Sequence, residues 1–165
     1  MGHEEIRIPP QNLEAERAVL GAMLIDEEAI GAVLERLDSS FFYDAAHQRI
    51  YESMIRLYSD RKNVDIITLS DRLKTDGGLE AIGGATYLAE LVETVPTSAN
   101  VLHYAEIVKE KGIKRKLIRN ATEIVTMSFA TDTEVDGLVD EAERLIFDIA
   151  SAWLRSIPQC QDSQA

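Results

Sequence analysis

The stretch from residue 100 to residue 150 restricts the possible folds more than any other part of the sequence. Its first part runs for about 28 residues without proline and carries apolar residues at helical spacing, which is long for a globular helix. Its second part repeats apolar residues at steps of three and four, as in the seam of a hairpin or coiled coil. Two long helices joined by a few residues must fold back on each other. We therefore predict a long antiparallel helical hairpin.

The predicted hairpin has apolar residues on more sides than its own two helices can cover. Because one hairpin has few neighbours, a partner chain is the simplest way to bury the remaining apolar side. We also predict that Thr131 and Glu134 form a capping box at the start of the second helix. The candidate self-association seam consists of Val101, Ala105, Val108, Leu117, Ala121, Leu138, Ala142, Leu145, Ile146 and Ile149.

Upstream of the hairpin, residues 12–97 are predicted to form a compact head of short helices. Apolar residues recur at helical spacing within each segment, and polar caps or glycine turns separate the segments. The stretch NVDIITL is the best strand candidate, but it carries its own helix cap, so we interpret it as helical. The expected start and stop signals are Asn12, Asp26, Asp65 with Thr68, the turn Asp76-Gly77-Gly78, the pair Gly83-Gly84, and Pro96.

Together these patterns predict an all-α fold. Pro9 and Pro10 fix φ and remove two backbone donors, so the residues before the head are expected to be extended. We interpret the last fifteen residues, and the Gly2-His3 start, as a truncated linker or a remnant of an expression vector. The predicted parts are an extended arm (1–11), a helical head (12–97), a self-associating hairpin (100–150) and a tail (151–165).

Basic residues gather once, in the stripe of residues 109–119, and this stripe offers a possible nucleic-acid contact at Lys114 and Arg115. The net charge of −12 opposes bulk binding to phosphate backbones. Charge pairing of the stripe with the segment DEAER, between the two helices of the hairpin or across a dimer, is the alternative that we favour. Gly112, within the stripe, is expected to mark a bend or a break in the helix.

The sequence contains no pattern that indicates catalysis, a metal or a cofactor. The phosphate-binding motif GxxxxGK[ST] is absent, so ATP hydrolysis by the usual route is not expected. The three histidines lack zinc-site spacing, and His103 with Glu106 fits a solvated or interfacial pair better than a metal site. Cys160, in the polar tail, is interpreted as a surface thiol.

No apolar run reaches the ~18 residues of a transmembrane helix, and the acidic start does not resemble a signal peptide. The single cysteine cannot form an internal disulfide. The cytoplasm is therefore the expected compartment, with no membrane partner.

Several long blocks of the chain resemble, in order, the N-terminal domain of DnaB-type bacterial replicative DNA helicases. The resemblance covers residues 6–150 and is more specific than a single motif would be. The blocks that carry it are IPPQNLEAERAVLGAML, FFYDAAHQRIY, DIITLSDRLK, GGLEAIGGATYLAELVETVPTSANVLHYAEIVKEK and LVDEAERLIFDIA.

The resemblance implies a helical head and a hairpin that pairs subunits into a dimer, or into a hexamer built as a trimer of dimers. It further implies docking of the helicase-binding domain of a DnaG-type primase, and a contribution to helicase loading by a loader protein. In such helicases a separate motor domain binds ATP and Mg²⁺, contacts DNA and unwinds the duplex in the 5′-to-3′ direction. The resemblance places candidate primase-facing residues at Glu14, Tyr87, Ile118 and Ile124.

The same four residues also fit purely structural roles. Glu14 suits the helix dipole in a first turn, Tyr87 suits the core of the head, and the two isoleucines suit the hairpin seam. Three hypotheses therefore remain. The first is an assembly and primase-docking domain, the second a module that binds single-stranded nucleic acid through residues 109–119, and the third an enzyme with an unrecognised site.

Overall fold

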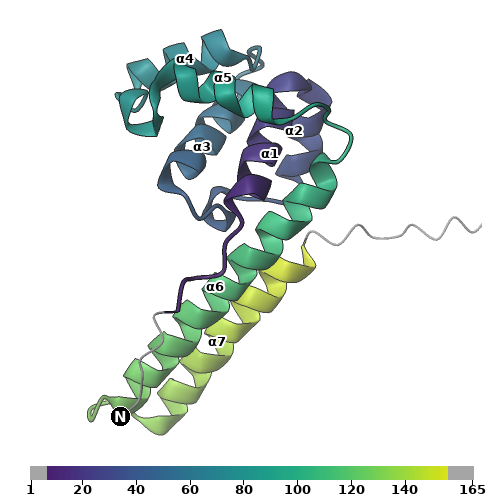
Figure 1. Cartoon of the computed structure of the whole chain (residues 1–165). Helices are drawn as coiled ribbons and strands as arrows, with labels where there is room; N and C mark the ends of the chain where they lie inside the picture. Colours follow the sequence, from purple (N-terminus) through teal and green to yellow (C-terminus); the bar gives the residue numbers. More distant parts are fainter. Residues whose placement is uncertain (1–6, 156–165) are drawn as a thin grey trace, which may run out of the picture.

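The structure is a computed structural model, and it describes residues 7–155. The described residues form helices and connecting segments only, which confirms the predicted all-α fold (Figure 1). We call α1–α5 the head, and α6 with α7 the hairpin. In chain order the elements are α1 Leu13–Ile25, α2 Glu27–Leu34, the 3₁₀ turn η1 Ser39–Phe41, α3 Ala45–Ser59, α4 Ile66–Thr75, the 3₁₀ turn η2 Glu80–Ile82, α5 Gly84–Thr94, α6 Val101–Phe129 and α7 Val135–Leu154.

Local caps start the head helices where the sequence predicted them. The Asn12 side chain accepts the amide of Ala15 at 3.0 Å at the start of α1. Asp26 caps α2 in the same way, through the amide of Glu28 at 3.0 Å. Asp65 and Thr68 form a complete capping box at the start of α4, so the NVDIITL stretch is helical as expected.

Helix α1 is the centre of the head, because it packs against both α5 and the beginning of α6. Val19, Leu20 and Met23 on α1 are fully buried in this core. Gly21 is the point of closest approach to α5. A Cβ atom there would overlap the Leu91 carbonyl oxygen and lie 2.8 Å from Val95.

Helix α6 of the hairpin also packs into the core of the head. Its first turns contribute Val101, Ala105 and Val108 to the core of the head, and these three side chains are at most 6% exposed. In Figure 1 the rest of α6 extends away from the head, with α7 running back along it. The core of the head therefore continues past residue 97, where we expected the head to end, into the first turns of α6.

Helix α6 is continuous through Gly112, so the chain has no helix break there, one of the two outcomes that we expected. The glycine instead makes room for the η1 turn, since a Cβ atom at this position would lie 2.9 Å from the Cα of Phe41. Phe41 is itself 3% exposed. Gly112 thus permits close contact between α6 and the loop that follows α2.

The start of α7 corrects a second expectation. The N-cap of α7 is Glu134, which has a β-region backbone and makes no side-chain capping bond. The capping box predicted for Thr131 and Glu134 is therefore wrong. Thr131 instead bonds its neighbour Asp132, within the exposed turn that joins the two helices.

Contacts along the hairpin hold α7 against α6. Leu145 and Ile149 of α7 are buried, and Asn120 of α6 donates to the Leu145 carbonyl at 3.1 Å. At the other end, Lys109 donates to the carbonyl of Trp153 at 2.6 Å and lies over its indole ring. Helix α7 therefore extends past residue 150, where we expected the tail to begin. Within the described residues, 7–155, no helix combines the length and apolar character needed to cross a membrane.

The close contact at Gly21 gives a testable consequence. We expect Gly21→Ala to lower the free energy of unfolding by about 1–3 kcal/mol, because the added methyl group forces α1 away from α5. Gly137→Ala on α7 is the matched control, since nothing lies within 4 Å of a Cβ atom there. Thermal unfolding followed by circular dichroism measures both variants. Equal midpoints for Gly21→Ala and Gly137→Ala would contradict the close packing.

Candidate partner interface

An apolar groove runs along one side of the hairpin, between α6 and α7. Its volume is about 550 Å³, and most of the side chains that line it are apolar. Leu117 and Ile146 are its most open large apolar side chains, with 41% and 46% of their surface exposed. The residues that line this hairpin groove are Glu110, Ile113, Lys114, Leu117, Ile146, Ile149, Ala150 and Trp153.

Exposed apolar side chains continue along the hairpin beyond the groove. Phe129 and Phe147 are 84% and 69% exposed, far more than large aromatic side chains in a folded core. An apolar surface of this length is typical of a site that another protein covers. The other exposed large apolar side chains of the hairpin are Leu102, Ile118, Val125, Val135, Val139 and Leu154.

The structure divides the ten residues of the candidate self-association seam into three groups. Val101, Ala105 and Val108 lie in the core of the head, where little of their surface is left for a partner. Leu145 and Ile149 are buried against α6. The members with surface still accessible are Leu117, Ala121, Leu138, Ala142 and Ile146.

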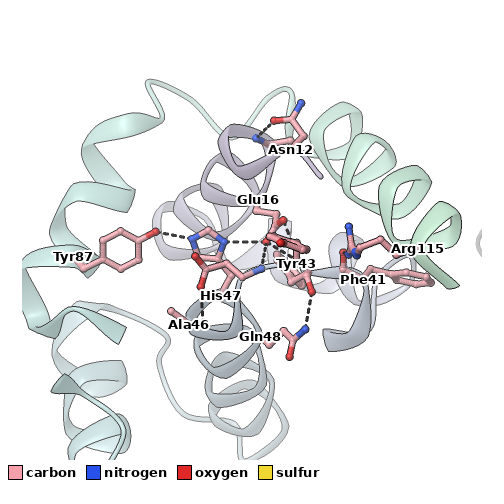
Figure 2. A network of polar contacts seen from close by, with 12 residues as sticks. Asn12, Glu16, Phe41, Tyr43, Ala46, His47, Gln48, Tyr87 and Arg115 are labelled. Carbon is pink, nitrogen blue, oxygen red and sulfur yellow. Dashed lines mark hydrogen bonds and ion pairs between the residues drawn. The ribbon is translucent and has the colours of Figure 1, made fainter. Parts of the chain in front are cut away.

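A buried polar network lies where the head meets α6, and Glu16 of α1 is at its centre (Figure 2). The Glu16 side chain is 2% exposed. Its carboxylate accepts the amide of Tyr43 at 3.1 Å and the amide of Asp44 at 3.3 Å. The carboxylate therefore fixes the backbone between η1 and α3, as a buried acceptor with several donors can.

His47 extends this network to α5. Its Nδ1 atom lies 3.0 Å from Glu16 and its Nε2 atom 2.6 Å from the Tyr87 hydroxyl, so the ring bridges α1 and α5 (Figure 2). His47 is fully buried, and burial raises the pKa of the Tyr87 hydroxyl. Three helices of the head are thus joined through one imidazole.

Arg115 of α6 joins the hairpin to the N-terminal arm and to η1. Its guanidinium donates to the carbonyls of Pro10 and Phe41, each at 2.7 Å, and lies 5.4 Å from the centre of the Tyr43 ring. Burial lowers the pKa of Arg115, although an arginine stays charged at neutral pH. The side chain predicted as a nucleic-acid contact therefore has internal partners, whereas Lys114 is exposed beside the hairpin groove.

The basic stripe 109–119 is not a continuous charged surface. Lys109 is 1% exposed and bonded to Trp153, and the Lys116 ammonium lies 4.5 Å over the ring of Phe41. The pairing with DEAER that we favoured does not occur within one chain, because no ion pair joins α6 to α7 among residues 7–155. Arg144 of that segment pairs instead with Glu141 and Asp148 on its own helix. Pairing across a dimer stays a prediction.

The four candidate primase-facing residues lie on both parts of the molecule. Glu14 is exposed in the first turn of α1, and Tyr87 is a half-buried residue of α5. Ile118 is 54% exposed on α6, and Ile124 is half-buried nearer the tip of the hairpin. The network through His47 and Glu16 reaches from Tyr87 to Tyr43, which lines the same pocket as Ile118.

Sequence reasoning missed Glu16, His47 and Lys109. A signal existed for two of them: Glu16 precedes Val19 and Leu20 by three and four residues, on the buried face of α1, and Lys109 follows Ala105 by four. A charged residue on a buried helix face requires a partner. Within the described part of the chain no cluster of potential metal ligands occurs, and His103 and Glu106 are exposed. Cys160 lies outside the described residues.

Comparison with known proteins identifies replicative DNA helicases among the relatives of this chain. The family model of the DnaB-like helicase N-terminal domain matches residues 8–110. The replicative DNA helicase DnaB of Geobacillus stearothermophilus is 46% identical over 144 residues, which is 87% of this chain and 32% of the relative. The replicative DNA helicase DnaC of Bacillus subtilis is 42% identical over the same shares. The chain thus spans about a third of the length of these curated relatives.

Two solved structures are similar in both fold and sequence. The N-terminal domain of the DnaB helicase from Mycobacterium tuberculosis superposes with a TM-score of 0.82 at 43% identity, covering 86% of this chain and 99% of that one. A DnaB-like replicative helicase, described together with its interactions with primase, superposes with a TM-score of 0.69 at 29% identity. That match covers 84% of this chain and 31% of the helicase.

The buried carboxylate of Glu16 makes a specific prediction. We expect Glu16→Gln to lower the free energy of unfolding by about 2–4 kcal/mol, because the amide group presents a donor to backbone amides that need an acceptor. The exposed Glu90→Gln on α5 should change it by less than about 0.5 kcal/mol. Urea denaturation measures both variants, and equal stability of the two would refute a structural role for the network.

Proposed function

The chain belongs to the DnaB-like helicase N-terminal domain family, and we propose that it is the assembly and partner-docking domain of a hexameric replicative DNA helicase. The observation that carries this proposal is the open apolar face of the hairpin. Leu117, Ile146 and Phe147 expose surface that a second hairpin would bury. We propose that two hairpins pair into a dimer, and that three such dimers form the hexamer.

We infer that ATP hydrolysis and duplex unwinding belong to a motor domain outside this chain. The chain spans about a third of the length of the related helicases, and its sequence lacks GxxxxGK[ST]. ATP and Mg²⁺ would bind in that motor, which would also make the main contacts to DNA. No catalytic residue is assigned to this chain.

The proposed docking partner is the helicase-binding domain of a DnaG-type primase, with a helicase loader as a further partner. Support comes from the similar helicase described with its primase interactions. The candidate contacts Ile118 and Glu14 are both exposed, as a docking surface requires. Tyr87 and Ile124 are half-buried, so each would contribute through a smaller accessible area.

The internal bonds of Lys109 and Arg115 weaken the alternative of a nucleic-acid-binding module. Affinity for phosphate backbones depends on several accessible Lys and Arg side chains that act together. Two of the basic residues in the stripe already donate hydrogen bonds to the carbonyls of Trp153, Pro10 and Phe41. We therefore favour protein partners over nucleic acid.

Self-association through the hairpin groove is tested by Ile146→Asp. We expect the dissociation constant of the oligomer to rise at least about tenfold, because a carboxylate in an apolar interface loses its hydration. Ile67→Asp is the matched control, since Ile67 is an 81% exposed isoleucine on α4 of the head. Sedimentation velocity across a concentration series gives both values. An oligomer unchanged by Ile146→Asp would exclude this face as the interface.

Primase docking is tested with the helicase-binding domain of the cognate primase. We expect light scattering to show a complex of the two proteins, and Ile118→Asp to weaken it at least about tenfold, since it places a charge in the contact. Ile67→Asp serves again as the control on the head. If Ile118→Asp binds primase with the same affinity as the wild-type chain, the primase contact does not include this position of α6.

A further inference from the structure

A second pocket, distinct from the hairpin groove, lies between the N-terminal arm, the loop between η1 and α3, and α6. Its volume is about 510 Å³, which is within the range of pockets that bind ligands. We call it the arm pocket. It is lined by Arg7, Ile8, Pro9, Ser40, Phe42, Tyr43, Gln48, Arg115, Ile118 and Arg119.

The charge of the arm pocket is opposite to that of the chain. Among the residues that the structure describes, three arginines line it and no carboxylate does, although the chain has a net charge of −12. Arg7 and Arg119 are exposed, and neither makes an ion pair with any residue between 7 and 155. Guanidinium groups placed in this way suit carboxylates or phosphates, which they bind in a bidentate manner.

Arg115 forms the fixed inner side of the pocket. Two of its N–H groups donate to the carbonyls of Pro10 and Phe41, so the side chain is held in place before any ligand arrives. Burial lowers the pKa of Arg115, whereas the negative charge of the Glu16 carboxylate favours the charged form of Arg115 and raises its pKa. The Glu16 oxygens already accept hydrogen bonds from Tyr43, Asp44 and His47. Glu16 therefore does not act as an internal carboxylate that occupies the arm pocket in place of a ligand.

Part of the remaining wall of the arm pocket is apolar, and two of its side chains are accessible. Ile8 and Ile118 are 72% and 54% exposed, and Phe42 forms part of the same lining. A free phosphate would leave this apolar wall uncovered. A nucleic-acid strand would need further cations along its path, but Lys109 and Lys116 are held by Trp153 and Phe41.

We propose that the arm pocket binds an acidic amphipathic segment of a partner protein. One or two large apolar side chains of the segment would cover Ile8 and Ile118, and its carboxylates would pair with Arg7 and Arg119. The proposal rests on the partner-docking function, because Ile118 is shared with the candidate primase contacts. It adds the chemistry of the segment that docks and the residues that select it.

Selection from a random-sequence peptide library tests the proposal without a known partner. The wild-type chain is the bait, and a variant with Ile118→Asp and Arg119→Glu is used for counter-selection. We expect the enriched peptides to combine Asp or Glu with Leu, Ile, Phe or Trp. Enrichment of basic or neutral peptides, or of none that depend on these two positions, would overturn the proposal.

Fluorescence polarisation with the most enriched peptide then locates the contact. Arg7→Glu and Arg119→Glu should each weaken binding about tenfold or more, since each replaces attraction by repulsion. Lys74→Glu makes a similar charge reversal at an exposed position of α4, and should leave the affinity unchanged. Equal effects of Lys74→Glu and Arg119→Glu would show that binding depends only on the net charge of the chain. That result would overturn the arm pocket as the binding site.

Competition identifies other occupants of the arm pocket. Pyrophosphate or oligothymidylate could displace the peptide from the wild-type chain but not from Arg119→Glu. That result would overturn the proposal and identify a small anion or a nucleic acid as the occupant. Sedimentation and primase association of the same variants separate this test from the proposed function. If the chain assembles and binds primase but fails the peptide test, the proposed function stands and only the proposal for the arm pocket is wrong.

Discussion

The contact between Phe41 and Gly112 determines how the hairpin leaves the head. Phe41 occupies the space where a side chain of α6 would otherwise be, and its carbonyl accepts a bond from Arg115 one turn further on. The Lys116 ammonium lies over the same ring. Because α6 is one continuous helix, fixing it at this point fixes the direction of its outer half and of α7. Together with the burial of Val101, Ala105 and Val108 in the head, that anchor sets where the exposed apolar residues of the hairpin lie.

The helices could be predicted from the sequence because the forces that start and end them are local. Asn12 reaches an amide three residues away, and Asp65 with Thr68 forms a box over the same distance. Apolar periodicity identified the two long helices for the same reason. Thr131 and Glu134 show the limit of such motifs, since the residue types were suitable but the backbone did not bring them together.

The candidate site was much less predictable, because its contacts join distant parts of the chain. Glu16 bonds the amide of Tyr43, 27 residues away, and Arg115 bonds the carbonyl of Pro10, 105 residues away. Periodicity also could not distinguish which apolar residues of α6 face the head and which remain open. Val108 and Leu117 look alike in the sequence, yet one is 1% and the other 41% exposed.

Helix α6 presents the hairpin groove and the arm pocket on different faces. Ile113, Leu117 and Lys114 line the groove, whereas Arg115, Ile118 and Arg119 line the arm pocket. Adjacent residues of a helix point roughly 100° apart, so these two sets turn away from each other. A second hairpin in the groove would therefore leave the arm pocket open. If the groove serves assembly and the arm pocket serves docking, as we propose, substitutions one residue apart, at Leu117 and at Ile118, are expected to separate the two.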